Sequence, residues 1–336
     1  MAGYDVITVG SATIDVFVDT DSELIKIKTS KGEEDLIAYP SGSKIIIKHI
    51  QFLTGGGGTN TAVSLSRSGL KVAYLGKLGN DDNAKKILAQ LKKEKVSFIG
   101  KISLTGKTGP EQTGYSIILD SIEQDRTILT YKGENDNLNI CDINFKKLKT
   151  KWFYFSSMVR TSFGTLEKLA EFAEEKKIKI IFNPSNYLAE KGKDFLANIL
   201  SRTDVLVLNK EEAELISGKG DIAYLIERLK SFGPKQVVIT DGRNGAYTSD
   251  RKYFYHVLPF RKITIKETTG AGDAFASSFL AGLIKKKNIE FALKLGIVNS
   301  SSVIQGIGAK TNLLKYSKAL NIIKKSRIKI EKKRLK

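Results

Sequence analysis

Short runs of β-branched and other apolar residues alternate along this chain with longer stretches in which apolar and polar residues are mixed. The apolar runs predict strands, and the mixed stretches predict helices that bury one face. This alternation is typical of an α/β fold with a mostly parallel sheet covered on both faces, whose ligands bind beyond the carboxyl ends of the strands. The predicted strands are residues 6–9, 72–75, 178–182, 205–208 and 237–240, and the predicted helices are residues 59–68, 82–93, 211–217 and 273–285.

Two regions, residues 20–52 and 112–131, interrupt this alternation with further short strand-like runs. We expect them to pair as a small sheet that lies over the site as a lid. An exposed edge of that sheet would favour pairing between subunits, so a homodimer through the lid is expected. The predicted organisation is an α/β catalytic domain (residues 1–19, 53–111 and 132–320), the lid (20–52 and 112–131) and a frayed basic C-terminal tail (321–336).

The composition restricts the function classes. With 336 residues, 41% of them hydrophobic, the chain can bury a large core. The formal net charge of +19 would suit nucleic acid, but the lysines are spread over nearly every predicted helix and no nucleic-acid-binding signature is present, so we do not expect that partner. Cys141 is the single cysteine, no apolar run is long enough to span a membrane, and the N-terminus lacks a signal-peptide pattern. We therefore expect a cytoplasmic protein.

The segment Glu-Thr-Thr-Gly-Ala-Gly-Asp at residues 267–273 precedes a helix of small and apolar residues. Gly270, Ala271 and Gly272 have little or no side chain, so N–H groups at a helix N-terminus stay open to an anion that the helix dipole attracts. We expect these groups to keep Asp273 ionised, so that it can accept a proton from a hydroxyl that attacks a phosphoryl group. The alternative is a glycine turn followed by an acid that complements the dipole.

A second glycine cluster at residues 55–58 is followed by Asn60. Gly55 and Gly56 would let a ligand approach the backbone, and the Asn60 amide can donate to and accept from sugar hydroxyls. The cluster is not a P-loop, because no Gly-Lys-Ser/Thr follows it, and it lacks the spacing of a dinucleotide fingerprint. A flexible turn is the alternative.

Polar residues also follow other predicted strands. Asn209 and Glu212, three residues apart, can hold hydrated magnesium, although the same pair is what a capping box requires. Asp15 follows the first strand, where it can grip two neighbouring hydroxyls or be a simple loop acid. His49 and His256 have no partners in the sequence that indicate a triad or a metal site, so we expect structural roles for both.

The strand at residues 237–240 ends in a glycine-rich turn that contains Thr240, Gly242 and Gly245. Such a strand end can take the phosphates or the ribose of a nucleotide. A plain tight turn is the alternative.

Taken together and in this order, the segments resemble the ribokinase-like family, also called the PfkB-type carbohydrate kinases, from about residue 4 to about residue 315. The most specific part of the resemblance is a pair of motifs. One consists of Gly55, Gly56 and Asn60 near the start of the chain, and the other of residues 268–273 near the end. The family implies a three-layer α/β/α sandwich with a β-sheet lid, in an enzyme that uses ATP and Mg²⁺.

The resemblance also implies roles for the matching residues. Asp273 would deprotonate the acceptor hydroxyl, and residues 270–272 would form the anion hole. The resemblance further implies sugar binding by Asp15, Gly55, Gly56 and Asn60, contacts of Asn209 and Glu212 with magnesium and phosphates, and a nucleotide near Thr240, Gly242 and Gly245. Many relatives bind a monovalent cation beside the anion hole, which here implies K⁺ held by Glu267 and the carbonyls of Thr269 and Gly308.

This chain departs from the family pattern at two positions. The family usually has Asp where this chain has Glu267, which puts activation by K⁺ in doubt. Gly57 stands where ribokinases often have Lys, which weakens an assignment to ribose itself.

The leading hypothesis is therefore a kinase of a small sugar, and the alternative is a nucleoside kinase of the same superfamily. A phosphosugar kinase would require more basic residues in the pocket, for which Arg126 and Arg160 are candidates. The remote alternative is a non-catalytic protein that binds sugar or RNA on the same fold.

Overall fold

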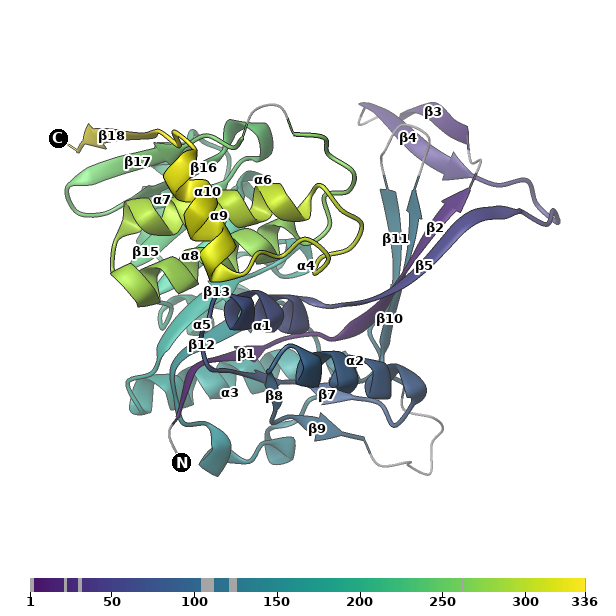
Figure 1. The fold of residues 1–336 in the computed structure, drawn as a ribbon, viewed down its shortest axis with the longest axis horizontal. Helices are drawn as coiled ribbons and strands as arrows, with labels where there is room; N and C mark the ends of the chain where they lie inside the picture. Colours follow the sequence, from purple (N-terminus) through teal and green to yellow (C-terminus); the bar gives the residue numbers. More distant parts are fainter. Residues whose placement is uncertain are drawn as a thin grey trace.

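The computed structural model describes residues 3–20, 23–29, 32–103, 112–120, 126–260 and 263–335. Within these residues, ten strands form the main sheet (Figure 1). The pairs from β8 to β15 are parallel, and β16, β17 and β18 continue the sheet with antiparallel pairs. In spatial order the strands are β18 (Ile330–Arg334), β17 (Tyr253–Val257), β16 (Ala246–Ser249), β15 (Gln236–Thr240), β14 (Val205–Asn209), β13 (Lys179–Asn183), β12 (Thr150–Ser156), β1 (Tyr4–Val9), β6 (Val72–Leu75) and β8 (Ser97–Phe98).

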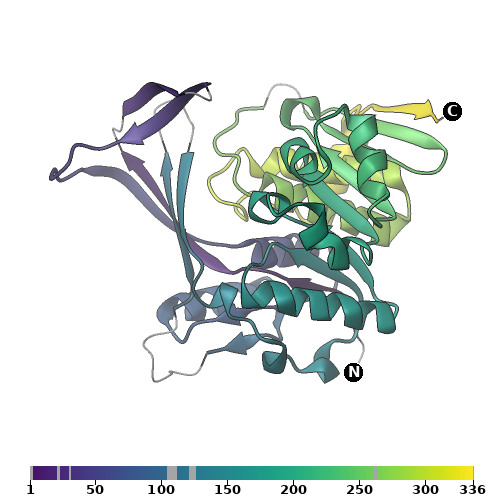
Figure 2. The same ribbon diagram turned by 180° about the vertical axis from the view of Figure 1, so that it is seen from behind.

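Helices cover both faces of this sheet, as Figures 1 and 2 show from opposite sides. One face carries α1 (Gly57–Arg67), α2 (Asp82–Lys93), α8 (Ala271–Lys286), α9 (Ile289–Val303) and α10 (Tyr316–Lys325). The other carries α3 (Thr161–Glu175), α4 (Asn186–Ala189), α5 (Gly192–Leu200), α6 (Lys210–Ser217) and α7 (Ile222–Lys230). The predicted α/β fold with a mostly parallel sheet is confirmed.

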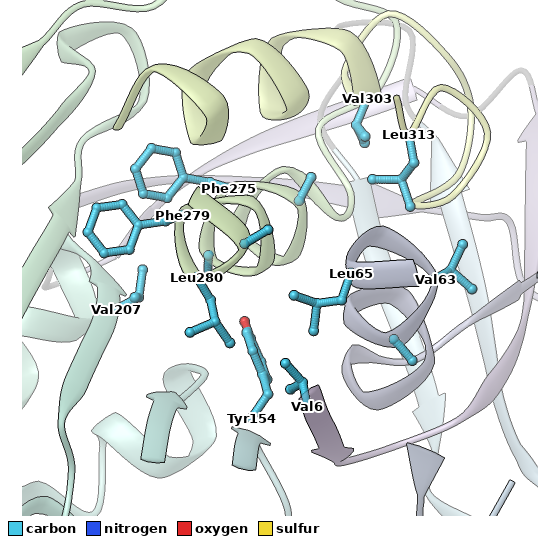
Figure 3. Close-up of a cluster of buried hydrophobic side chains, with 14 of the residues drawn as sticks. Val6, Val63, Leu65, Tyr154, Val207, Phe275, Phe279, Leu280, Val303 and Leu313 are labelled. Atoms are coloured by element: carbon cyan, nitrogen blue, oxygen red, sulfur yellow. The ribbon is translucent and has the colours of Figure 1, made fainter. Parts of the chain in front are cut away.

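Strand β12 lies in the centre of the sheet, although the sequence analysis did not predict it. Successive side chains of a strand point to opposite faces, so its aromatic residues contribute to two separate cores. Phe153 and Phe155 pack on the face that carries α3, whereas Tyr154 packs on the face that carries α1 and α8. Figure 3 shows Tyr154 and Val6 of the sheet facing Leu280 of α8.

A separate four-stranded sheet, called here the small sheet, projects from the main body beside α1 and α2 (Figure 1). Its order is β11 (Arg126–Tyr131), β10 (Gly114–Asp120), β2 (Thr13–Thr20) and β5 (Ile47–Gly55). Two further strand pairs are β3 (Glu23–Thr29) with β4 (Gly32–Ala38) and β7 (Lys77–Leu78) with β9 (Lys101–Ile102). The predicted small separate sheet is therefore present, but β3 and β4, which we placed in it, pair only with each other among the described residues.

The bounds of the small sheet differ from those that we predicted. Only three residues, 10–12, separate the end of β1 from the start of β2 at Thr13. The chain passes from one sheet to the other across these residues. Residues 13–19, which we placed in the catalytic domain, are thus part of the small sheet. That the small sheet acts as a lid stays a proposal.

The C-terminal residues also differ from the frayed tail that we expected. Strand β18 pairs antiparallel with β17 and extends the main sheet. The Nζ atom of Lys332 lies 4.1 Å from the centre of the Tyr253 ring and 3.1 Å from Oε1 of Glu290. The side chain of this lysine therefore packs on the strand while its charge is paired with Glu290. In the part of the chain that the structure describes, no helix combines the length and the apolar character that crossing a membrane requires.

Candidate active site

The predicted anion cradle lies at the N-terminus of α8. Gly270 has φ +80°, a left-handed conformation, and an added Cβ would lie 2.7 Å from Cα of Ala309, so both conformation and space require glycine. Gly272 is exposed, and an added Cβ there would meet no protein atom within 4 Å. Ala271 and Gly272 both line a large cavity. The first turn of α8 therefore borders open space, although N of Ala271 already donates to the carbonyl of Thr268 at 3.2 Å. That this turn binds an anion stays a prediction.

Asp273, in that first turn, meets the early glycine cluster. Its Oδ2 atom accepts a hydrogen bond of 2.8 Å from Nδ2 of Asn60 in α1. A Cβ placed on Gly57 would lie 3.6 Å from Oδ1 of Asp273 and 3.1 Å from Oγ of Ser156, the last residue of β12. Two motifs from opposite ends of the chain thus converge on one point.

The pKa of Asp273 is higher than we expected, although it still leaves the carboxylate mostly ionised at neutral pH. We expected helix N–H groups to keep it ionised, but burial raises its pKa to about 6, and the nearby carboxylate of Asp15 also raises it. The hydrogen bond from Asn60 and the charge of Lys310 act in the opposite direction. A carboxylate with a pKa near 6 is matched to proton transfer close to neutral pH.

Asp15, on β2 of the small sheet, is the second carboxylate at this point. Its Oδ1 accepts a hydrogen bond of 2.7 Å from Thr13, and burial raises its pKa against the effect of that bond. The Asp15 carboxylate occupies the space that a side chain on Gly55 would need. Gly56 has φ +90° and precedes the first residue of α1. The glycines therefore allow the turn, the acid and the helix to pack closely.

Two buried polar atoms beside Asp273 have no hydrogen-bond partner among the residues that the structure describes. They are Oδ1 of Asn60 and Oγ of Ser156, whose side chains are 5% and 4% exposed. Buried polar atoms are normally satisfied by protein, water or ligand. The site therefore offers hydrogen-bonding capacity to a polar molecule that enters it.

Asn209 and Glu212 form the capping box that the sequence left as an alternative. Oδ1 of Asn209 accepts from N of Glu212 at 2.8 Å, and Oε2 of Glu212 accepts from N of Asn209 at 2.9 Å. Burial raises the pKa of Glu212 to about 7, and the charge of Asp273 is among the further causes. Glu212 thus lies within electrostatic range of Asp273.

Thr240, Gly242 and Gly245 line the same cavity as Gly272, whose volume is about 1140 Å³. The predicted nucleotide residues and the anion cradle therefore face one continuous space. The other walls are mostly apolar and come from both sheets and from the segments around α9; they include Phe17, His49, Gln51, Phe260, Ile265, Ile297 and Ile304.

The residues predicted to bind a monovalent cation are only partly joined by hydrogen bonds within the described part of the chain. Oε1 of Glu267 accepts a hydrogen bond of 2.6 Å from N of Thr269, and the hydroxyl of Thr269 is buried without a partner. Gly308, with φ +86°, accepts from N of Thr311 at 3.4 Å. His256 has a structural position, between the carbonyl of Asn244 and Glu331.

Arg160, a candidate for binding a phosphosugar, forms an ion pair with Asp136 at 3.5 Å and is 81% exposed. The side chain of Arg126 lies outside the described part of the chain. Neither observation places a basic group beside Asp273.

Sequence reasoning missed Ser156 and Lys310. Lys310 is 5% exposed, and its charge acts on both Asp15 and Asp273. Residues 306–314 are mostly small or apolar, and Lys310 is the one charged residue among them. This pattern could have singled it out, because a lysine in a buried segment usually has a partner for its charge.

A family model described as pfkB family carbohydrate kinase matches residues 6–315. The chain is 28% identical to a ribokinase of Staphylococcus aureus, over 81% of this chain and 89% of that protein. It is also 28% identical to a cytidine kinase of Thermococcus kodakarensis, over 82% and 94%. A structure of Arabidopsis thaliana ribokinase complexed with ribose and ATP has a TM-score of 0.80 at 19% identity, with 96% of this chain and 99% of that chain covered.

The family match covers most of the chain and agrees with the fold, so the resemblance inferred from the sequence is confirmed. The chain belongs to the pfkB family of carbohydrate kinases and is a ribokinase-like phosphotransferase that acts on a hydroxyl of a sugar or a nucleoside.

Proposed function

We propose that this enzyme transfers the γ-phosphoryl group of ATP to a hydroxyl of a small sugar, with Asp273 as the catalytic base. The observation that carries the proposal is the convergence of Asp273, Asn60 and Asp15 next to the open amides of α8. The Arabidopsis ribokinase, whose structure contains ribose and ATP, supports ATP as the donor.

In the proposed reaction, a carboxylate oxygen of Asp273 takes the proton of the acceptor hydroxyl. At the same time, the oxygen of that hydroxyl attacks the γ-phosphorus of ATP. A new P–O bond forms, the bond to the bridging oxygen breaks, and ADP leaves with that electron pair. The amides at residues 270–272 would stabilise the charge on the transferring group, because preorganised donors act most strongly in a site from which water is excluded. The small sheet would exclude that water as a lid.

The acceptor would be held by Asp15, Asn60 and the backbone at Gly55 and Gly56. The carboxylate of Asp15 can accept from two hydroxyls, and the unpartnered Oδ1 of Asn60 can accept from a third. A polyhydroxylated acceptor satisfies these atoms better than a simple alcohol. The nucleotide would lie in the 1140 Å³ cavity, with its phosphates directed to the turn of Thr240, Gly242 and Gly245.

Magnesium fits this site as an ion held mainly by phosphate and water. Among the described residues, no group of three or more His, Cys, Asp or Glu side chains gathers where it could hold a metal. One oxygen of Glu212 is engaged in the capping box, so Asn209 and Glu212 would hold the ion through water, which suits the slow dehydration of Mg²⁺. When bound, the ion would neutralise negative charge on the phosphates.

We also propose K⁺ as a second ion, bound by Glu267 and the carbonyls of Thr269 and Gly308. The buried, unpartnered hydroxyl of Thr269 supports a polar occupant there. Replacing K⁺ by tetramethylammonium in the assay should lower the rate, and an equal rate would contradict this part of the proposal.

A homodimer through the small sheet is also proposed. Ile50, Phe52, Leu129 and Tyr131 share one face of this sheet by register, and each is more than half exposed. Exposed apolar residues that are grouped in this way mark interaction surfaces. Light scattering of wild type and of a Phe52→Lys variant tests it, and a wild type that is monomeric at micromolar concentration would contradict it.

Nucleoside phosphorylation is the second candidate. It is favoured by the cytidine kinase, which is as similar to this chain as the ribokinase is, and by Gly57 in place of the lysine frequent in ribokinases. A coupled assay for ADP with ribose, fructose, ketodeoxygluconate, ribose phosphate, adenosine, cytidine and inosine separates the two. Phosphorylation of a free sugar above all nucleosides supports the first candidate, and the reverse order supports the second. Turnover that persists in Asp273→Asn would contradict the proposed base.

A further inference from the structure

Lys310 is a buried cation that neither the family motifs nor the proposed mechanism uses. It lies in the segment between α9 and α10 and is 5% exposed. Its Nζ atom donates to Oγ1 of Thr59 at 2.8 Å and to the carbonyl of Thr54 at 2.9 Å, and the carbonyl of Gly55 lies at 3.4 Å. Thr54 and Gly55 are the last two residues of β5 in the small sheet, and Thr59 lies in the first turn of α1.

The charges around Lys310 divide into two groups. Glu94, at the end of α2, is bound by Arg67 of α1 through two hydrogen bonds of 2.6 and 3.0 Å, so its charge already has a partner. Asp15 of β2 and Asp273 of α8 have no arginine partner among the contacts of the described residues. Lys310 interacts with both through space: burial lowers the pKa of Lys310 to about 7, and the charges of Asp15 and Asp273 act in the opposite direction. Arg67 also donates to the carbonyl of Lys310 at 3.0 Å, which fixes the backbone that carries the lysine.

Burial of an ammonium group is costly unless its charge is compensated, and the same holds for two carboxylates that approach one another. Lys310 therefore has a second effect beyond its hydrogen bonds, because it lies within electrostatic range of two acids from different elements. We propose that Lys310 is a positioning residue of the active site: its ammonium group ties the end of β5 at Thr54 and Gly55 to Thr59 of α1, and its charge offsets the negative charges of Asp15 and Asp273. This inference rests on the proposed role of Asp273 as the base.

The charge effect has a defined direction. Lys310 lowers the pKa of Asp15 and of Asp273, whereas burial and the two acids' mutual repulsion raise the pKa of Asp273. Two further acids interact with this group: Glu212 with Asp273, and Glu267 with Asp15, whose pKa it raises. Loss of the lysine charge should therefore raise the pH at which Asp273 becomes protonated and the enzyme loses activity.

The first experiment measures kcat/KM against pH for wild type, Lys310→Met and Lys310→Arg. Methionine has a side chain of similar length without charge. The acidic limb of the kcat/KM profile of Lys310→Met should therefore shift to higher pH by about one unit. We expect the acceptor KM to rise while the ATP KM changes little. Lys310→Arg keeps the charge and should keep the wild-type limb. An unmoved limb in Lys310→Met would overturn the proposal.

Lys285→Met is the matched control for this experiment. Lys285 lies at the far end of α8, over the ring of Tyr316 at 4.5 Å, and its Nζ is 3.5 Å from the carbonyl of Gly69. It is a lysine with a carbonyl contact but without a site carboxylate nearby. Its pH profile should match that of wild type.

The second experiment measures thermal unfolding at neutral pH for Lys310→Met, Asp15→Asn and the double variant. Each buried charge is compensated by the other, so the double variant should be at least as stable as Lys310→Met alone. If Lys310→Met does not fold, the double variant should still fold. A double variant less stable than Lys310→Met would overturn the charge compensation. This result needs no activity, so it remains informative even if Asp273 is not the base.

Discussion

Asn60 donates its side-chain amide hydrogen to Asp273 across 2.8 Å, although the two residues are 213 positions apart in the chain. The bond joins α1 to α8 and orients the carboxylate at the point where the glycine cluster leaves space for a ligand. It also leaves Oδ1 of Asn60 free to accept from that ligand. The two motifs of the sequence thus form one site, in which each residue orients the other.

Asp273→Asn tests the base directly. The variant keeps the shape of the side chain but cannot accept a proton, so turnover should fall by about two to four orders of magnitude. Nucleotide affinity, measured by calorimetry, should change little, because the nucleotide cavity is lined by other residues. If most of the turnover survived, Asp273 would not be the base.

Gly272→Val tests the anion cradle. An added Cβ meets no protein atom within 4 Å, so the fold should tolerate valine, while the side chain would occupy the space of the transferring phosphoryl group. The rate should fall at least about a hundredfold, the usual effect of losing one preorganised donor.

Gly164→Val is the matched control for the cradle variant, because Gly164 is also an exposed helical glycine whose added Cβ would meet nothing within 4 Å. The control should have the wild-type rate. A normal rate in Gly272→Val, with both variants folded by circular dichroism, would mean that the phosphoryl group lies elsewhere.

The raised pKa of Asp273 predicts how stability depends on pH. Its folded-state pKa of about 6 exceeds the ordinary value of 3.8, so the folded chain holds a proton where the unfolded chain has released it. Stability is therefore lost as pH rises from about 4 to about 6, and the loss persists at higher pH. Asp273→Asn should have a higher Tm than wild type at about pH 8, and the difference should shrink at about pH 4. An equal difference at both pH values would argue against a raised pKa.

The Glu212→Gln variant distinguishes the structural role of Glu212 in the capping box of α6 from its proposed role in binding Mg²⁺. Glutamine at this position can still complete a capping box, so the Tm should stay close to that of wild type. Loss of the charge should raise the Mg²⁺ concentration needed for half-maximal rate by about tenfold, as for other groups that act on a metal through water. Glu212→Ala, which loses the cap as well, should also lose about 1 kcal/mol of stability. If the Mg²⁺ requirement stayed unchanged in both variants, the pair would be a cap and nothing more.

The sequence was most informative where the chemistry is local. Gly270 and Gly272 stand close to Asp273 in the chain, so their position at the start of a helix could be predicted from spacing alone. Lys310 could not, because the acids that it faces come from β2 and α8 and no local pattern records that proximity. Ser156 was missed for the same reason: its strand was not predicted, and only the fold places it beside Gly57.

The C-terminal strand shows the opposite error. The density of lysines in residues 321–336 favoured a solvated tail, since like charges repel. Aromatic rings on β17 provide the surface over which Lys332 packs. The pattern of charges along the chain does not predict these aromatic partners on β17.

The passage of the chain from β1 into β2 across residues 10–12 has a mechanical consequence. Asp15 belongs to the small sheet and Asp273 to the main body, so a rotation of the small sheet against the main body would change the distance between the two acids. With the small sheet as the proposed lid, the enzyme would be a competent catalyst only when the lid is closed. Idle consumption of nucleotide in the absence of an acceptor would thereby be limited by geometry alone.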